Sequence, residues 1–521
     1  MKKNNIITYI VSLFLTISII LTLYIGNVNQ MNATFFTEFH FISLSFIVPV
    51  LLVSIILFIL LKLFLKLLGK TYIYQSNKLF NNKIVFIISL ITIFCSGLLF
   101  LLTYYPGTGM VDSLQIISDP IGFSSHYPII YSLVFSFIFK FYYSITNVVN
   151  LSFFLMELTQ LIVVTILLSY VIYYFHKTFK SNIFTIFTIL YFNIFTIFSN
   201  LNSAHLRDTL FSMFMLLLIT KIYEIIKSNG ELLSKDKFRY KFLLIIILMV
   251  FTRNNAIFSL LVLMGILFIK YRKQYKSLIL CTIVIIVFTN FNMLLPKKYY
   301  KKGLFQESVS HPIQQIAYVL TFDKVDKEDE EYLDNIMNTN AIRAIYYPFM
   351  VDELKWHELF NGYYLNDTKD KFMKVWYKYL KKYPEDYLKA YTLNTYSLWS
   401  INSFVDWESN FLYINSNYRN LKNERILPKI EQHYLEKFYK KTTKFLNNGS
   451  IFWIYVLLGL VLIYKNKKEY LLILVPFYAL WINLMVASPL SSAFRYMCVF
   501  GYGLPFVLNL IFTREKTNDI H

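Results

Sequence analysis

The stretch FISLSFIVPVLLVSIILFILLK, residues 41–62, has no charged residue before its last position, Lys62. A helix needs about 20 predominantly apolar residues to cross the hydrocarbon core of a bilayer. Residues 41–62 therefore predict a transmembrane helix.

Apolar stretches of the same kind occur on both sides of it. They run over residues 6–26, 84–104, 149–174, 183–200, 208–226, 241–252, 256–271, 277–295, 451–464, 470–487 and 495–512. The first follows Met1-Lys2-Lys3, but its apolar core is about 20 residues long and no small-residue cleavage site follows, so we read it as a retained anchor. The sequence predicts an all-α polytopic membrane protein with about 12 transmembrane helices.

The composition agrees with this class and excludes others. Residues of the AVILMFWYC group make up 56% of the 521 positions and charged residues only 16%, against about 45 to 50% and about 25% in soluble domains. The three cysteines, Cys95, Cys281 and Cys498, all fall in apolar runs. These features exclude a disordered chain, a disulfide scaffold and a typical soluble enzyme.

The net charge of +20 belongs to the membrane part. Residues 296–450 contain 23 Lys/Arg and 20 Asp/Glu, which leaves 28 (51 − 23) against 11 (31 − 20) elsewhere. The basic segments are 62–83, 175–182, 227–241, 270–276, 465–468 and the tail with Arg514 and Lys516. Positive charge between spans marks the cytoplasmic side, so we expect no nucleic-acid partner and a cytoplasmic N-terminus.

A thirteenth apolar run, Tyr127 to Ile145, decides the orientation of everything after it. If this run lies at the membrane surface, every basic segment faces the cytoplasm; if it crosses, four of them face outward. We therefore expect a juxtamembrane helix here, within the exterior loop 104–148.

This topology predicts three parts. Residues 1–295 form an N-terminal transmembrane module that includes loop 104–148, residues 296–450 form an extracellular, mainly helical domain, and residues 451–521 form C-terminal transmembrane helices with a short cytoplasmic tail. Abundant Asn, Ile, Lys, Tyr and Phe are typical of an AT-rich genome, as in low-GC Gram-positive bacteria.

Asp112 follows the third span in the segment Tyr104-Tyr-Pro-Gly-Thr-Gly-Met-Val-Asp112. Pro106, Gly107 and Gly109 interrupt the helix where it leaves the bilayer. A carboxylate at this depth suits a general base, because partial desolvation raises its pKa toward neutrality. Capping of the next helix is the structural alternative.

Several arginines lie at the same predicted membrane face. Arg253-Asn254 follows an apolar run, 241–252, that spans only about 18 Å at about 1.5 Å per residue, so Arg253 should be recessed below the outer surface. A planar, permanently charged guanidinium there suits phosphate binding. Arg207-Asp208 and Arg495 lie where other spans begin on the exterior side, although anchoring and capping explain such positions as well.

Polar residues of the loops complete the candidate set. His126 opens the juxtamembrane helix together with Pro128, a common helix start. Glu307, His311 and Gln314 follow one another at i, i+4 and i+7 along one helix face after the ninth span. Glu157, inside the fourth span with Gln160 one turn further, is either functional or a polar contact between helices.

In this order the motifs resemble the GT-C class of glycosyltransferases, and within it an uncharacterised bacterial branch. The shared elements are Tyr105-Pro-Gly, Asp112-Ser-Leu-Gln115, Ser125-His-Tyr-Pro128, Arg207-Asp208, Arg253-Asn254, Glu307-Ser308, Pro312-Ile-Gln-Gln315 and the stretch Trp376 to Trp399 with Tyr383-Pro384 and Tyr387-Leu-Lys-Ala390. The likeness runs from about residue 85 to the end. Two positions depart from it: Ser113 stands where many relatives have a second acid, and His126-Tyr127 stands in place of two histidines.

The resemblance implies an inverting enzyme that takes a sugar from a polyprenyl-phosphate donor, with Asp112 as catalytic base. The acceptor would be a cell-envelope glycan, teichoic acid, lipid or protein on the extracellular face of the cell membrane. Arg253, Arg207 and Arg495 would hold the donor phosphate, and His126, Glu307, His311 and Gln314 would line the sugar or acceptor cleft. Further substrate-binding residues would be Asp208, Asn254 and Tyr105. No cofactor and no metal site are expected, while the Ser113 departure leaves metal dependence open.

Two other functions remain as alternatives. A transporter or flippase of lipid-linked saccharides would also use arginines, although transporters usually show internal repeats and charges at the bilayer midplane. A wall-polymer polymerase or ligase would be an enzyme whose large loop supplies the working arginines.

Overall fold

The computed structural model describes residues 2–28, 39–108, 111–121, 127–291, 303–323, 325–401, 421–422, 424, 426–427, 429–443, 445–487 and 493–514. Within these ranges, the side chains of residues 2–3, 26–28, 111–112, 429–433 and 443 are not described. The described chain is helical almost throughout, and its strands β1 (Ile73–Tyr74) and β2 (Thr513–Arg514) form one short parallel pair. The structure thus confirms an all-α membrane protein.

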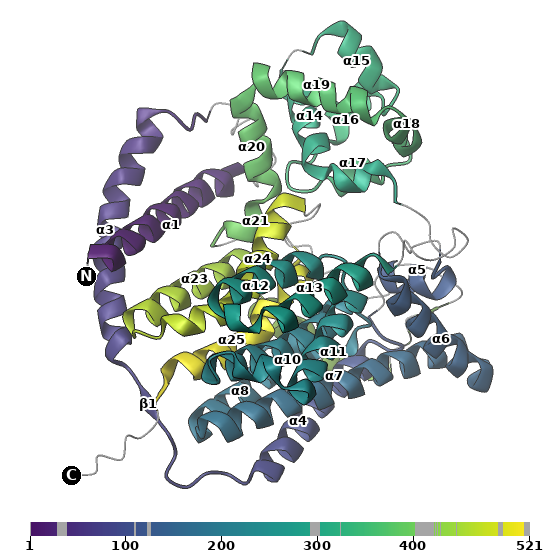
Figure 1. Ribbon diagram of the computed structural model, residues 1–521. Coiled ribbons are helices and arrows are strands. Elements are labelled where there is room, and N and C mark those ends of the chain that lie inside the picture. The colour runs from purple at the N-terminus through teal and green to yellow at the C-terminus, as the bar shows by residue number, and fades with distance from the viewer. Residues whose placement is uncertain are drawn as a thin grey trace.

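The long apolar helices form a bundle that occupies the lower part of Figure 1. They are α1 (Lys2–Val28), α3 (Leu44–Lys70), α4 (Asn82–Thr103), α7 (Val149–Phe179), α8 (Asn182–Ile194), α9 (Thr196–Ser203), α10 (Arg207–Lys227), α11 (Asp236–Thr252), α12 (Ala256–Lys270), α13 (Tyr275–Thr289), α23 (Asn448–Tyr464), α24 (Leu471–Ala487) and α25 (Cys498–Phe512). The α1–α3 pair stands beside the rest and contacts α23.

The predicted number of about 12 spans is not confirmed. Among the described residues, seven helices are long and apolar enough to cross a membrane, or eight if the bent pair α8–α9 counts as one span. Helices α12, α23 and α25 are apolar but shorter. Helix α11 begins at Asp236, before the apolar run 241–252, and has this carboxylate in its first turn.

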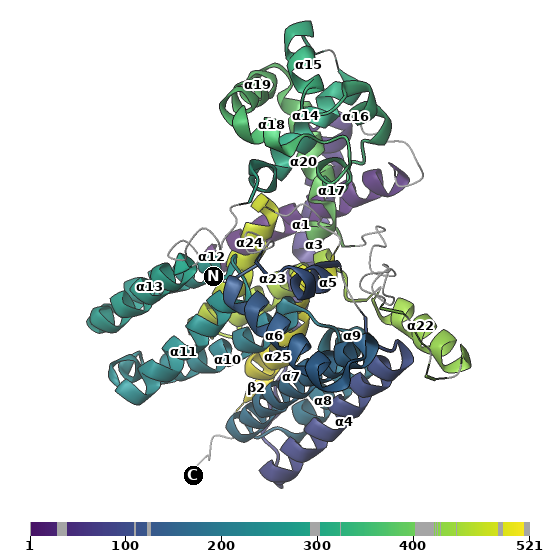
Figure 2. The ribbon, with the colours of Figure 1, turned by 90° about the vertical axis from the view of Figure 1, so that its right-hand side faces the viewer.

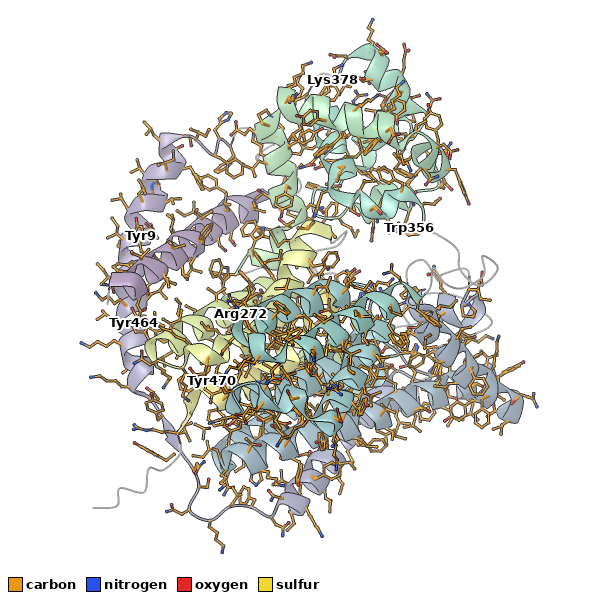
Figure 3. The ribbon with its side chains drawn as sticks, in the orientation of Figure 1. Tyr9, Arg272, Trp356, Lys378, Tyr464 and Tyr470 are labelled. Carbon is orange, nitrogen blue, oxygen red and sulfur yellow. The ribbon has the colours of Figure 1, made fainter. Side chains whose placement is uncertain are left out.

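The basic segments between the helices meet at one end of the bundle. Ser76 donates its backbone N–H to the carbonyl of Lys180 at 2.9 Å, and Lys465 donates to the carbonyl of Thr71. Other basic segments lie in the left half of Figure 3, where the labels mark Arg272, Tyr464 and Tyr470. We call this the basic end and the other the site end. The shared location is what the charge pattern predicts.

Two short helices at the site end connect α4 to α7: α5 (Val111–Ser118) and α6 (Ile129–Thr146). Although α6 is apolar and long enough to cross a membrane, its contacts fall on the first third of α7. The hydroxyl of Thr146 lies 2.7 Å from that of Ser152, and the hydroxyl of Tyr142 lies 2.8 Å from that of Thr159. Helix α6 therefore packs on the part of α7 nearest the site end, and its position at the membrane surface stays a prediction.

Short helices between α13 and α23 form a separate unit, which we call the helical domain, at the top of Figures 1 and 2. They are η5 (Phe305–Ser308), α14 (Ser310–Phe322), α15 (Lys327–Asp334), α16 (Thr339–Ile345), α17 (Asp352–Lys355), α18 (Gly362–Asp367), α19 (Lys369–Lys382) and α20 (Pro384–Asn394). The central helix α14 packs against α16, α19 and α20. Helices α21 (Tyr396–Trp399) and α22 (Lys429–Thr443) pack instead on the bundle, against α23 and α9.

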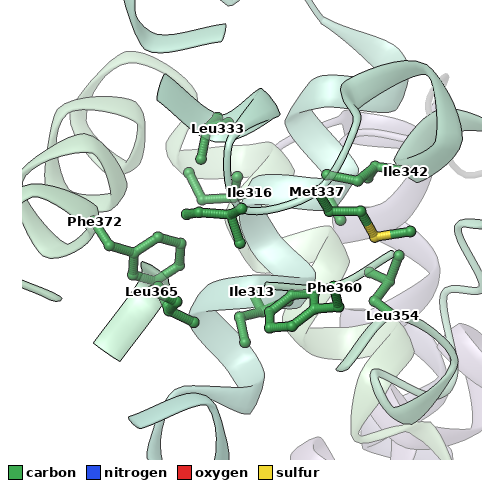
Figure 4. A pocket seen from close by; sticks show the side chains of 11 residues that line it. Ile313, Ile316, Leu333, Met337, Ile342, Leu354, Phe360, Leu365 and Phe372 are labelled. Carbon is green, nitrogen blue, oxygen red and sulfur yellow. The ribbon is translucent and has the colours of Figure 1, made fainter. Parts of the chain in front are cut away.

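The core of the helical domain encloses a cavity of about 30 Å³. Apolar side chains of α14, α15, α16, α18 and α19 line it, among them Ile316, Met337 and Phe372 (Figure 4). A cavity that holds about one water molecule but offers that water no polar partner stays dry. This cavity is a packing void of the core and not a binding site.

Candidate functional site

Five of the predicted site residues lie at the site end of the bundle. Helix α10 begins with Arg207 and Asp208, the turn after α11 carries Arg253 and Asn254, and Arg495 lies in the 3-10 helix η9 (Phe494–Tyr496) that precedes α25. Helices α10 and α11 pack against each other, and α10 also contacts η9. Three segments far apart in the sequence thus bring their arginines together.

Arg253 and Asp208 form a buried ion pair. Nη1 of Arg253 lies 3.1 Å from Oδ1 of Asp208, and only 6% and 2% of the two side chains are exposed. Helix α11 ends at Thr252 and the backbone of Arg253 is extended, with φ −150°. The guanidinium is therefore recessed below the end of the bundle, as the short apolar run predicts. Asp208 lies in the first turn of α10, where the helix dipole favours a carboxylate.

Aromatic rings hold the three guanidinium groups in place. The Cζ atoms of Arg253 and Arg495 lie 5.5 Å and 5.0 Å from the ring centroid of Tyr496, and Arg495 also donates to the Tyr496 hydroxyl at 3.3 Å. Arg207 lies over the ring of Tyr127, 4.1 Å from its centroid. These distances permit cation–π attraction, which is strongest where water is excluded. We call Arg207, Asp208, Arg253, Arg495, Tyr127 and Tyr496 the arginine cluster.

Helix α5, which carries Asp112, is anchored beside this cluster. Oγ of Ser113 is buried and donates to the carbonyl of His205 at 2.6 Å, two residues before Arg207. Leu114 and Ile117 pack in an apolar cluster with Phe139, Phe153 and Met156. The side chain of Asp112 itself lies outside the described residues, and so does the whole of His126. Because the hydroxyl of Ser113 points inward, it fixes α5 against the turn that carries His205.

A buried carboxylate lies under the loop that leads to α5. Glu157 of α7 is fully buried, and neither of its oxygens has a hydrogen-bond partner. Gly107, with φ +146°, passes so close that a Cβ there would lie 3.0 Å from Cγ of Glu157. Glu157 is therefore part of the same site rather than a contact elsewhere in the bundle.

Polar groups around Glu157 connect α6, α7 and the turn between α9 and α10. Gln160 donates to the carbonyl of Ala204, and the ring of His205 packs against those of Phe135 and Tyr131, with centroids 3.9 and 5.8 Å away. Burial lowers the pKa of His205 to about 3, so the imidazole is neutral. The charges of Arg207, Asp208 and Glu157 all act on the Tyr131 hydroxyl. The arginine cluster and the buried carboxylate therefore belong to one electrostatic environment.

Tyr105 lies at the edge of this region. Its ring packs 5.4 Å from that of Phe154, and its carbonyl accepts from the backbone N–H of Glu424 at 3.0 Å. Burial, and secondly the Glu424 charge, raise the pKa of Tyr105, so its hydroxyl is a neutral donor.

The other three predicted site residues lie in the helical domain: Glu307, His311 and Gln314. Their contacts join this domain to α24 or stabilise it internally. Nε2 of His311 donates to the carbonyl of Met485 in α24 at 3.0 Å, while Nδ1 accepts from Nδ2 of Asn394 at 2.8 Å. Burial is the main cause that lowers the pKa of His311, so the ring is neutral. Gln314 donates to the carbonyl of Tyr347 at 2.6 Å. Oε2 of Glu307 lies 3.2 Å from the ammonium of Lys355.

The helical domain nevertheless reaches the arginine cluster. Tyr347 and Tyr496 both pack against Met350 and Ala493. Gln314 of α14 donates a hydrogen bond to the carbonyl of Tyr347. Tyr496, in turn, lies next to the guanidinium groups of Arg253 and Arg495. A continuous set of contacts therefore joins α14 to the arginine cluster. In the described part of the chain, no group of three or more His, Cys, Asp or Glu side chains could hold a metal ion.

Reasoning from the sequence missed several members of this site: Tyr127, Tyr496, Tyr131, His205 and Ser113. Tyr496 directly follows Arg495, and His205 lies in the same polar turn as Arg207. Adjacency to a predicted arginine was therefore the available signal. The pairing of Arg253 with Asp208 had no such signal, because it depends on how α10 packs on α11.

Among curated proteins and solved structures, none matches the chain significantly. One family profile matches residues 117–521, a range that covers the arginine cluster and the helical domain and begins after Asp112. The chain therefore belongs to the family of unknown function DUF6020.

Proposed function

We propose that this protein is an integral membrane glycosyltransferase that moves a sugar from a polyprenyl-phosphate donor to a cell-envelope acceptor on the extracytoplasmic face. Asp112 acts as the general base, and the arginine cluster binds the donor phosphate. The site end is then the extracytoplasmic end, and the basic end faces the cytoplasm, as the positive-inside rule prefers.

The observation that carries the proposal is the arginine cluster itself. Arg207, Arg253 and Arg495 come from three distant segments and gather at one end of a membrane bundle, beside the helix that bears Asp112. Such a group of guanidinium side chains suits an anionic ligand, because a phosphate accepts their directed hydrogen bonds.

The proposed reaction is a single displacement. Asp112 takes the proton of an acceptor hydroxyl as its oxygen attacks the anomeric carbon. The new C–O bond forms while the bond from the anomeric carbon to the phosphate oxygen breaks, and the lipid phosphate leaves with the electron pair. The arginines stabilise the charge that develops on this leaving group. The sugar is therefore transferred with inversion.

The helical domain supplies aromatic surface for the glycan. Trp356 and Tyr363 have 59% and 74% of their surface exposed, and Trp356 lies at the edge of the domain nearest the bundle (Figure 3). Exposed aromatic faces suit the apolar faces of sugar rings. A glycan bound there would lie between the domain and the site end.

The test is transfer by purified protein in detergent, with a membrane lipid extract as donor source and mass spectrometry of the products. The wild type should form a glycosylated product, and Asp112→Asn should fold but lose at least about 100-fold in rate, as expected for a lost general base. Asp119→Asn, seven residues further on, is the matched control and should keep its rate. Normal turnover by Asp112→Asn would exclude Asp112 as the general base.

A transporter of lipid-linked saccharides is the second candidate, and one observation favours it. Helices α8 and α9 meet at a 71° bend, and all eight residues of α9 are buried, including Asn200 and Asn202. Broken helices with polar residues at membrane depth are typical of transporters. The detergent assay separates the two, because only an enzyme forms product without a sealed compartment. Movement of substrate into proteoliposomes without any product would favour the transporter.

A further inference from the structure

Three cations surround one tyrosine at the basic end. Nζ of Lys465 lies 3.5 Å from the ring centroid of Tyr72, Cζ of Arg514 lies 5.3 Å from it, and Nζ of Lys467 lies 5.9 Å from it. We call these four residues the Tyr72 cluster. They follow the ends of α3, α23 and α25, and the β1–β2 pair joins the segments after α3 and α25 at the lower left of Figure 1.

Backbone carbonyls satisfy part of this charge. Lys465 donates to the carbonyl of Thr71, and Lys467 donates to the carbonyls of Leu510, Ile511 and Thr513 at 3.1 to 3.3 Å. These carbonyls carry partial charge only. Within the described ranges, none of the ion pairs includes Lys465 or Arg514.

The cluster therefore gathers three cations around one ring in a partly dry place. Lys465 is only 7% exposed. Burial, and secondly the charge of Lys467, lower the pKa of Lys465 to about 8. A nearby anion would offset both the desolvation and the repulsion between like charges.

The apolar surface above the cluster indicates where such an anion comes from. Leu63, Phe64 and Leu67 on the last two turns of α3 are 60%, 45% and 67% exposed, as expected of side chains that face acyl chains. An anion that reaches Tyr72 along this surface is one attached to a lipid. Basic groups between helix ends are known to suit such headgroups.

We propose that the Tyr72 cluster binds the headgroup of an anionic phospholipid. The phosphate lies among Lys465, Lys467 and Arg514, and the acyl chains lie along the end of α3. This site is remote from the arginine cluster and does not depend on the glycosyltransferase proposal.

The test is thermal unfolding of the purified full chain in detergent, with added phosphatidylglycerol, phosphatidylcholine or inorganic phosphate at equal concentration. Phosphatidylglycerol should raise the midpoint of the wild type by roughly 2 to 4 °C, and the other two additions should not. Arg514→Gln should lose at least half of the rise, whereas Arg514→Lys should keep most of it. Lys468→Gln, an equal loss of charge on an exposed side chain outside the cluster, is the matched control and should respond like the wild type.

Three results would overturn the proposal. An equal rise of the unfolding midpoint with phosphatidylcholine would show that the protein does not distinguish an anionic lipid from a zwitterionic one. An equal rise with inorganic phosphate alone would show that the site binds a free anion rather than a lipid. An undiminished rise in Arg514→Gln would place the lipid elsewhere on the protein.

Discussion

The guanidinium of Arg253 contacts the carboxylate of Asp208 in the interior of the site end, between the rings of Phe211 and Tyr496, which lie 5.6 and 5.5 Å from its Cζ atom. Asp208 fixes one edge of the guanidinium. Since Arg253 is held by a carboxylate and two rings before any ligand arrives, little side-chain entropy remains to be lost on binding a phosphate.

The first prediction concerns this pair. Removing one partner leaves a buried charge uncompensated, so Asp208→Ala should lower the free energy of unfolding by about 3 to 5 kcal/mol. The double variant Asp208→Leu with Arg253→Met should recover most of that loss, because apolar residues can replace a buried pair. The double variant should nevertheless lack transfer activity, because it has no Arg253 to bind the phosphate. Thermal unfolding and the detergent transfer assay measure the two effects, and an active double variant would exclude Arg253 from phosphate binding.

The second prediction concerns the anchor of α5. Ser113→Ala removes the hydrogen bond to the carbonyl of His205 and should cost about 1 kcal/mol of stability. If this bond positions Asp112, kcat should fall by more than tenfold with little change in KM.

Ser118→Ala provides the control for that experiment. The hydroxyl of Ser118 bonds only to carbonyls of its own helix, Leu114 and Gln115, among its described contacts. Its loss should leave kcat within about twofold. Equal effects of the two substitutions would show that Ser113 has no special positioning role.

The third prediction concerns Glu157, whose oxygens lack hydrogen-bond partners. Glu157→Gln keeps the shape and removes the buried charge, so the unfolding midpoint should stay or rise. Transfer should fall at least tenfold if the carboxylate works in the site under Gly107. Thr165→Val, two turns deeper in α7, should keep its activity. Full activity of the Glu157→Gln protein would show that Glu157 contributes only to packing.

The fourth prediction is a pH dependence of the domain attachment. The pKa of His311 is lowered in the folded protein, so the unfolded or detached state binds the proton more readily. The contribution of His311 is fully present above its ordinary pKa of about 6.5 and declines as the pH falls below it. Limited proteolysis of the helical domain should therefore accelerate between about pH 6.5 and 5.

His311→Gln should flatten this profile, because an amide does not titrate in that range. His357→Gln removes an imidazole from the same domain, away from α24, and should keep the wild-type profile. An unchanged profile in His311→Gln would assign the pH response to another group.

The sequence predicts the scaffold well for a physical reason. Apolar length and the location of lysines and arginines follow directly from the energetics of a bilayer, so the helices and the shared basic end can be read from them. The recessed position of Arg253 follows likewise from a short apolar run. The number of spans was harder to predict, because α12, α23 and α25 are short and the α8–α9 pair is bent.

The partners of the site residues could not be read in this way. His311 and Gln314 share a helix face, as predicted, but that face meets Met485 and Tyr347 and not an open cleft. A polar face on a helix suits a binding cleft and a docking surface equally. The choice between them depends on how α14 packs on α24, and no local pattern encodes that packing.

The most direct test of the account is an experimental structure with a non-transferable polyprenyl phosphonate sugar bound. We expect the phosphonate oxygens to contact the guanidinium of at least one of Arg207, Arg253 and Arg495. The carboxylate of Asp112 should lie within about 10 Å of them, roughly the width of a lipid headgroup region. A phosphonate bound away from all three arginines, or an Asp112 carboxylate that faces the basic end, would contradict the account.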